Sequence, residues 1–286
     1  MRMRTALLPA LVLAFAFAFA SDARADVTRN VPVVTQIQGA TFYRTSITLT
    51  NGNETLTAPV VMDFSYRSPA DGTFQIATLT LSPALGPKRV AFFDDIIQEF
   101  KNAGRIRAAD TSQGLFGTLL VTFGVLDIKA EAGVVARIYS AAPGGGTLGF
   151  AFDGKCFCEA GTRFRALGGG RDGVFGNDGS TRANLGIVND GDASGVGATD
   201  VRITYFDGST GTQLKQFFLS DLIHHDLEAN EVAQINNIFN DSAIPSTTTT
   251  LMIKVEAQQA DFYVTAYIVQ LDNTTQDGSF FYLFEE

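Results

Sequence analysis

Short stretches in which apolar and polar residues alternate recur from one end of the chain to the other. Tyr43, Ile47 and Leu49 fall on one face of such a stretch, with polar side chains between them. Alternation predicts a β-strand, because successive side chains of a strand point to opposite faces of the sheet. In the first half of the chain the pattern predicts strands at residues 31–34, 43–50, 60–67, 74–81, 90–93, 117–123 and 134–139. Turns rich in Asn, Asp and Gly separate them, so we expect an all-β protein with antiparallel sheets.

The same succession of strands occurs a second time. Arg44 and Asn51, at the two ends of the first clear strand, match Arg182 and Asn189, and both matches span 138 residues. Later matches span 139, 132 and 130 residues, a drift that insertions in surface loops produce. They join residues 62–66 with 201–205, 119–123 with 251–255, and 134–138 with 264–268. We therefore expect two tandem copies of one β-sandwich domain.

Each copy also carries a short segment of helical character. Asp95 can cap a helix that begins at Ile96, Gln98 can reach back to the cap, and Phe100 lies on the same helical face as Ile96. The matching insert of the second copy spans residues 235–239. We expect both inserts to turn their apolar side chains inward and to cover an open end of a sandwich.

These patterns predict a β-sandwich over residues 26–153, a glycine-rich linker or arm over 154–172, and a second β-sandwich over 173–286. Phenylalanine and tyrosine carry the aromatic packing, because the chain has 24 Phe and no Trp. The closing run 280–284 strongly favours β structure. If exposed, it would form a strand edge that needs a partner.

The first 25 residues have the features of a secretory signal peptide. A basic start precedes an apolar run over residues 6–20, and Ala23-Arg24-Ala25 supplies small residues at a cleavage site before Asp26. We expect a secreted or periplasmic protein without a membrane span after cleavage. Without residues 1–25 the formal charge changes from −9 to −11, which disfavours binding to nucleic acid or to an anionic membrane surface.

Cys156-Phe157-Cys158 is the most conspicuous local motif. In an exported protein the two thiols can oxidise to a disulfide, and one across a single intervening residue closes a small, strained ring. Two thiolates could also hold a soft metal such as Cu(I), whereas a closed zinc site needs four ligands. A possible disulfide between Cys156 and Cys158, within one chain or between chains, is our main interpretation.

Two acidic clusters invite a metal hypothesis. Asp190, Asp192 and Ser194 have the spacing that opens a calcium loop, but the position of the bidentate acid is occupied by Val201. Calcium is thus an open hypothesis, and no other cofactor is expected. His224-His225-Asp226, close to Glu228 and Glu231, could bind a metal or supply a general base, and a polar loop explains it equally well.

No arrangement of residues points to nucleophilic catalysis or to a phosphate-binding loop. There is no Gly-x-Ser-x-Gly sequence, and no Ser or Cys has His and an acid in a recognisable pattern. Arg44 and Arg182 occupy the same place in the two strands. We expect each to pair with an acid on a neighbouring strand or to lie across an aromatic ring.

The signal peptide, the strand Arg44-x-x-Ile-x-Leu-x-Asn51 with its second copy, and the later Val-x-Ala-x-Ile strand resemble a class of bacterial exported proteins, most of them uncharacterised. Those proteins have tandem immunoglobulin-like β-sandwich repeats. The resemblance implies the same fold for nearly all of the mature chain and supplies no catalytic residues. The Cys…Trp…Cys core of antibody domains is missing.

Three functions follow as hypotheses. The first is a non-enzymatic binding or structural protein of the envelope or exterior, whose partner is a protein or a surface glycan. The second is an exported hydrolase or carbohydrate-active enzyme, which requires a cleft lined by paired carboxylates, expected where the domains meet. The third is a self-assembling surface subunit joined through the C-terminal edge at residues 279–286.

Overall fold

The computed structural model of the protein describes residues 26–39, 41–124, 126, 131–142, 145–156, 163–170, 181–192, 194–275 and 277–285. The expected signal peptide at residues 1–25 lies outside this range. Antiparallel strands make up most of the described chain, as the alternation predicts, and the helices are short. No helix in the described part is long and apolar enough to cross a membrane.

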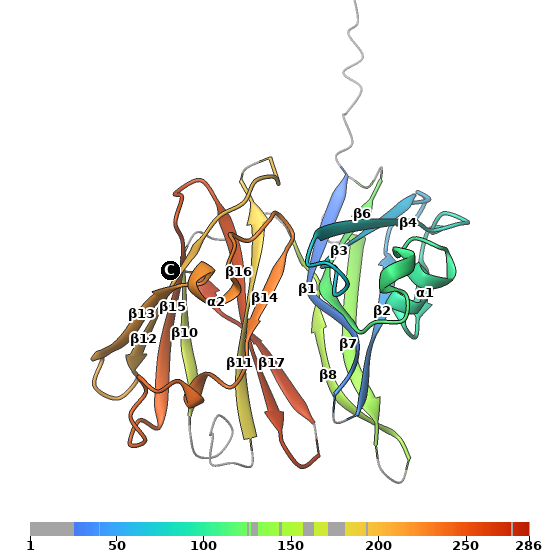
Figure 1. The fold of residues 1–286 in the computed structure, drawn as a ribbon. Coiled ribbons are helices and arrows are strands. Elements are labelled where there is room, and N and C mark those ends of the chain that lie inside the picture. The colour runs from blue at the N-terminus through green and yellow to red at the C-terminus, as the bar shows by residue number, and fades with distance from the viewer. Residues whose placement is uncertain are drawn as a thin grey trace, which may run out of the picture.

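The first half of the molecule, residues 26–156, forms two facing layers of strands (Figure 1). One layer has the order β4-β3-β6-β1, and the other has β2 paired with β5 and β7, and β7 paired with β8. Strand β1 links the layers, because it pairs with β6 along most of its length and with β2 at Gln36–Gln38. The strands are β1 (Val27–Gln38), β2 (Phe42–Asn51), β3 (Val60–Arg67), β4 (Phe74–Thr80), β5 (Arg89–Phe93), β6 (Leu115–Phe123), β7 (Ala132–Ala141), β8 (Thr147–Asp153) and β9 (Lys155–Cys156), which pairs with β1.

The second half, residues 163–285, forms one sheet of order β13-β12-β15-β10-β18 and another of order β14-β11-β16-β17. Adding nine to each strand number of the first half gives the pairings of the second half, except that β1 pairs with β2 whereas β10 and β11 lie in separate sheets. The strands are β10 (Arg163–Gly170), β11 (Thr181–Gly191), β12 (Val201–Asp207), β13 (Gln213–Phe218), β14 (Val232–Ile235), β15 (Thr250–Ala257), β16 (Tyr263–Asp272), β17 (Gly278–Tyr282) and β18 (Phe284–Glu285).

The stretch 154–172, expected to be a linker or arm, contains two strands. Strand β9 pairs with β1, and β10 pairs with β15 and β18 inside a sheet of the second half. The second set of strands therefore begins at Arg163 rather than after 172. Glycine lowers the intrinsic preference for a strand, but backbone hydrogen bonds to two neighbouring strands outweigh that preference here.

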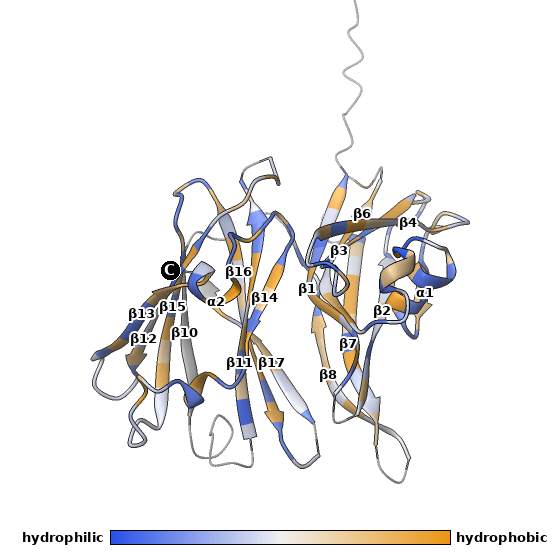
Figure 2. Ribbon diagram, in the orientation of Figure 1, coloured by the Kyte–Doolittle hydropathy of each residue, from blue (hydrophilic) through white to orange (hydrophobic). Residues whose placement is uncertain are grey.

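Each half buries its own apolar stripe, visible as orange segments along the strands in Figure 2. The first core joins inward residues of both layers, among them Ile47, Met62, Phe64, Leu119, Val121 and Ala136. The second core joins Leu185, Ile187, Ile203, Ile253, Val255 and Ala266. These sets match the alternation of the sequence, since every second residue of a strand faces the opposite layer.

Short helical inserts follow β5 and β14. Helix α1 (Ile96–Asn102) is capped by Asp95, which accepts a hydrogen bond from the Gln98 N–H at 3.1 Å. Its residues Ile96, Ile97 and Phe100 are buried, as expected from the sequence. In the second half a 3₁₀ turn at Ile238–Asn240 buries its first two side chains in the second core. A further helix, α2 (Ser220–Ile223), follows β13.

A fully buried asparagine lies at the end of β2 and two residues before the end of β11, with the same hydrogen bonds. The Asn51 amide donates to the Leu85 carbonyl at 3.0 Å, and the Asn189 amide donates to the Leu227 carbonyl at 2.8 Å. Each side-chain oxygen accepts the backbone N–H two residues further on. A buried amide costs free energy unless its groups are hydrogen-bonded, so these contacts fix the loop that follows each strand.

The two halves pack directly on each other. The outward face of the β14-β11-β16-β17 sheet lies against β1, β6, β3 and β8 of the first half (Figure 1). The first core extends onto four residues of that face: Val188, Val232, Tyr267 and Val269. The Tyr267 ring stacks on Phe280 with 4.8 Å between centroids, and Phe280 stacks on Phe152 of β8 at 4.2 Å. The aromatic C-terminal run thus packs partly inside the chain.

Candidate functional site

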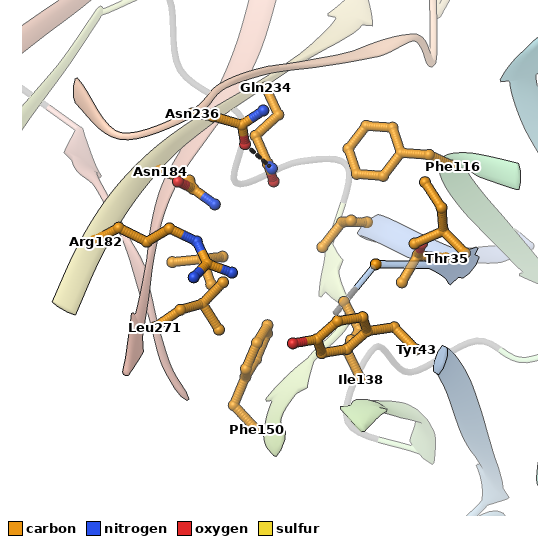
Figure 3. Close-up of a pocket in the computed structure, with 14 residues that line it drawn as sticks. Thr35, Tyr43, Phe116, Ile138, Phe150, Arg182, Asn184, Gln234, Asn236 and Leu271 are labelled. Atoms are coloured by element: carbon orange, nitrogen blue, oxygen red, sulfur yellow. Dashed lines mark hydrogen bonds between the residues drawn. The ribbon is translucent and has the colours of Figure 1, made fainter. Parts of the chain in front are cut away.

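A groove of about 390 Å³ opens where the two halves meet (Figure 3). Strands β1, β2, β6, β7 and β8 supply one wall, and β11, β14, β16 and the residues after β14 supply the other. Its lining consists of Val33, Thr35, Ile37, Gly39, Tyr43, Phe116, Ile138, Phe150, Arg182, Asn184, Gln234, Asn236, Val269 and Leu271.

The wall from the first half is mainly apolar. Strand β1 contributes Val33 and Ile37, which follow the alternation of the strand. Around them are the rings of Tyr43, Phe116 and Phe150; in Figure 3 Phe116 and Tyr43 lie at the right and Phe150 at the bottom of the view. Three aromatic rings and branched aliphatic chains form a surface suited to C–H groups of a ligand.

The wall from the second half carries polar groups. Arg182 and Asn184 project from the outward face of β11, and Gln234 projects from the adjacent strand β14 (Figure 3). The Gln234 amide donates to the Asn236 side-chain oxygen at 2.7 Å. The Asn184 side-chain oxygen accepts the N–H of Asn237 at 2.9 Å, and Figure 3 shows its amide nitrogen directed toward the groove.

Charge is sparse in this groove. Arg182 also donates a hydrogen bond to the side-chain oxygen of Asn273, which anchors the guanidinium at one end of the groove. The described residues that line the groove include no aspartate and no glutamate. A carboxylate pair for general acid–base chemistry, expected in a hydrolase, is thus not among them.

Beside the groove, an ion cluster joins the halves. Arg67, at the end of β3, donates to both oxygens of Glu231 at 2.6 and 2.8 Å. His225 Nε2 lies 3.0 Å from the same carboxylate, and the Glu228 N–H donates to it at 2.9 Å. Burial alone favours neutral Glu231, but these hydrogen bonds outweigh it and hold its pKa below the ordinary value. His225 therefore belongs to an interface contact.

Asp190 is the second buried acid between the halves. Its two oxygens accept hydrogen bonds from the Asn30 amide at 2.5 Å and from the Thr265 hydroxyl at 2.7 Å. Burial raises the pKa of Asp190 to about 7, although both hydrogen bonds favour the charged form. The acid thus titrates near neutrality at a point where β1 meets β11 and β16.

The hypothetical calcium ligands do not converge. Asp190 points into the contact between the halves, whereas Asp192 closes its own loop by accepting the Ser194 N–H at 2.8 Å and the Ser194 hydroxyl at 2.6 Å. These hydrogen bonds lower the pKa of Asp192. Within the described residues no group of three or more His, Cys, Asp or Glu side chains is placed to hold a metal ion.

The Cys156-Phe157-Cys158 motif is only partly described. The backbone of Cys156 ends β9 and pairs with Arg29 of β1. Cys158 lies outside the described residues, so the possible disulfide stays a prediction.

The two matched arginines have different surroundings. Arg44 forms an ion pair with Asp94 at 3.1 Å, and its guanidinium lies 4.9 Å from the centroid of the Tyr139 ring. The Tyr139 hydroxyl donates to Asp94 at 2.5 Å, and burial followed by this hydrogen bond raises its pKa to about 12. Arg44 therefore has both of the contacts predicted for it, whereas Arg182 lines the groove.

Sequence reasoning did not single out Tyr43, Phe116, Phe150, Asn184 or Gln234 as site residues. Asn184 lies on the outward face of a predicted strand, where alternation assigns solvent exposure. Tyr43 was assigned to the same face as the buried Ile47 and Leu49, and Phe116, Phe150 and Gln234 lie outside the predicted strands. The sequence does place two polar residues, Arg182 and Asn184, at outward positions of β11. It does not show which part of the molecule these side chains contact.

Comparisons with known proteins add little to this description. No family model matches the chain, and no curated protein does. Among solved structures, the apo form of a lectin from Pleurotus ostreatus matches with 9% sequence identity over 91% of this chain and 76% of the lectin, at a TM-score of 0.19. A likeness at that level carries no argument. The chain is a predominantly β protein with sandwich-like antiparallel layers.

Proposed function

We propose that the chain is an exported, non-enzymatic binding protein made of two tandem immunoglobulin-like β-sandwich domains, and that it binds a surface carbohydrate in the groove between them. The observation that carries the proposal is the pairing of an aromatic wall with a wall of carboxamides and one arginine. Secretion rests on the N-terminal sequence.

The two-domain part of the proposal is supported by the strand pairings. Apart from the β1–β2 pairing, both halves have the same order of strands, and Asn51 and Asn189 make the same hydrogen bonds near the ends of corresponding strands. The short helical inserts follow corresponding strands, with Ile96 and Ile238 buried at their starts. A single ancestral domain, copied once, accounts for all three features.

Carbohydrate is the ligand class that the two walls suit best. Sugar rings present C–H groups on one side, which pack on Tyr43, Phe116 and Phe150. Their hydroxyls both donate and accept, as do the amides of Asn184 and Gln234. The volume of about 390 Å³ lies within the ordinary range of ligand sites, toward its lower end. One or two sugar units fit such a volume.

The alternative of a hydrolase has less support. The groove is the place where the domains meet, and its described lining has no carboxylate. Buried acids nearby are already engaged: Glu231 by Arg67, and Asp190 by Asn30. These contacts hold the halves together and leave no acid–base pair aimed at the groove.

The test uses residues 26–286 of the protein and a panel of immobilised neutral and acidic oligosaccharides. We expect at least one sugar to bind, and expect Arg182→Ala and Gln234→Ala to weaken that binding about tenfold each, the effect of one lost hydrogen bond of ~1.4 kcal/mol. Arg44→Ala is the matched control, because Arg44 has the same strand position but lies outside the groove. Binding of no sugar, or binding that all three variants preserve, overturns the proposal.

A further inference from the structure

The two sheets that correspond in strand order differ in what covers them. The outward face of β14-β11-β16-β17 is covered by the first half of the chain. The outward face of the corresponding strands β5, β2, β7 and β8 is covered by no described segment. The same kind of surface is thus an interface in one half and open in the other.

The open face carries an apolar patch. Phe92 and Val90 of β5 are 63% and 60% exposed, and Val135 of β7 is 42% exposed. The register places Thr48 of β2 between Phe92 and Val135, so these side chains lie in one row across three strands. A hollow of about 380 Å³ lies along this row, bordered by Arg44, Arg137 and Tyr139. Large exposed apolar side chains gathered on one sheet face mark an interaction surface.

We infer that this face, with the row Phe92–Thr48–Val135 at its centre, is the docking surface for a second copy of this chain. Within the chain, the corresponding face is covered chiefly by the layer that contains β3, β6 and β1. In the second half the corresponding layer is β12, β15 and β10, flanked by β13. No described segment covers the outward face of that layer, so a neighbouring copy can present it.

The presented face has side chains suited to the contact. Phe206 of β12, Phe218 of β13 and Met252 of β15 point outward and are each partly exposed. Beside them Arg202 and Lys254 form ion pairs with Glu256 at 3.0 and 2.9 Å. Aromatic and methionine side chains are enriched in interfaces, and polar groups are common at the rim.

A contact between two different faces of the same chain is heterologous, and the two faces lie on opposite sides of the molecule (Figure 1). Each added copy therefore leaves one open face of each kind, and assembly continues beyond a dimer. The C-terminal run is not required, because Phe280 is already packed on Phe152 and Tyr267.

The test is sedimentation velocity on residues 26–286 over a concentration series from low micromolar to millimolar. We expect an average mass that rises past that of a dimer. Phe92→Asp and Val135→Asp are each expected to hold the protein as a monomer at concentrations where the original chain assembles. Ile76→Asp is the matched control, since Ile76 is 59% exposed on β4, outside the contact. Circular dichroism checks that each variant folds.

Val135→Asp gives a second readout, because Val135 is 42% exposed at the other end of the row. Should Phe92→Asp not fold, the comparison of Val135→Asp with Ile76→Asp still decides. A monomer at every concentration, an assembly that stops at two copies, or equal effects of Phe92→Asp and Ile76→Asp would overturn the inference. Carbohydrate binding in the groove is unaffected by any of these outcomes, because no groove residue is changed.

Discussion

The strands β5, β2, β7 and β8 of the first half and β14-β11-β16-β17 of the second pair alike but meet different surroundings. Their inward residues are of the same type: Ile47 and Leu49 correspond to Leu185 and Ile187, and all four are fully buried. The outward residues differ, with Thr48 in the first sheet where the second has Gly186. Packing inside the sandwich thus constrains the residues on the inward face of each strand. The residues on the outward face depend on what the sheet contacts.

Glycine at position 186 is explained by the covering half. The Tyr267 ring lies flat over Gly186, and a β-carbon there would stand 1.9 Å from the ring carbon Cζ. Only glycine allows the ring to lie between the sheet and the first half. In the open sheet no ring covers Thr48, so a branched residue is accommodated. The comparison separates residues required by the fold from residues required by the contact.

The largest expected difference between the two sheets is in the pH dependence of stability, and it comes from an acid that only the covered sheet contains. Asp190 follows Asn189, whereas Gly52 follows Asn51. Because the folded pKa of about 7 exceeds the unfolded value near 3.8, the fold favours the neutral acid. This contribution is complete below pH ~4 and is lost as pH rises through 7, at most about 4 kcal/mol at ~1.4 kcal/mol per pH unit.

We therefore expect Asp190→Asn to abolish a fall in unfolding free energy between pH 4 and 7, measured by urea titration at several pH values. Glu231 acts with the opposite sign: its lowered pKa stabilises the fold above pH ~4.5, and this is lost as pH falls. A pH slope that persists unchanged in Asp190→Asn would show that Asp190 is not its source.

The second expected effect is steric. Gly186→Val should destabilise the protein by about 3 kcal/mol, because the side chain must displace the Tyr267 ring and open the contact between halves. Thr48→Val is the control in the open sheet and should change the unfolding free energy by less than about 0.5 kcal/mol. Urea denaturation at one pH measures both, and equal effects would mean that the two outward faces are not different in packing.

Much of the fold follows from alternation, and the reasons for the exceptions are physical. Strands 43–50 and 60–67 were predictable because one face of each is buried. The match of 62–66 with 201–205 is displaced by two residues. Ala58 and Thr199 form equivalent bridges, and the strands that follow begin at Val60 and Val201, so these two residues are structurally equivalent. A shift of two residues keeps every side chain on its face, so alternation alone cannot detect it.

The groove could not be predicted in the same way. Its residues come from both halves, and their meeting depends on packing between sheets, which local patterns do not encode. Strand β10 was missed for a related reason, because its pairing partner β15 lies about ninety residues further along the chain. The contacts of Arg44 could be predicted, because a long cationic side chain on a sheet surface can reach an acid or an aromatic ring beside it, here Asp94 and Tyr139.

The third prediction compares ion pairs of the two surfaces. Arg67→Ala should cost about 2 kcal/mol, because it removes two hydrogen bonds from Glu231, a carboxylate only 5% exposed. The expected result is a lower urea midpoint with an unchanged slope. The double variant Arg67→Ala with Glu231→Gln should recover part of the loss, since no buried charge is then left unpaired. No recovery would indicate that Arg67 acts through packing alone.

The smallest expected effect is at the open sheet. Arg44→Ala removes an ion pair whose partners are 39% and 59% exposed, so the Coulomb term is screened and the cost should be about 0.5 kcal/mol. The cation–π contact with Tyr139 adds to the pair only weakly at such an exposed site. We expect the effect to shrink further in high salt, whereas that of Arg67→Ala should hardly change, because the Glu231 carboxylate is shielded from counterions. An Arg44→Ala loss as large and as salt-independent as that of Arg67→Ala would mean that the open face is covered in solution.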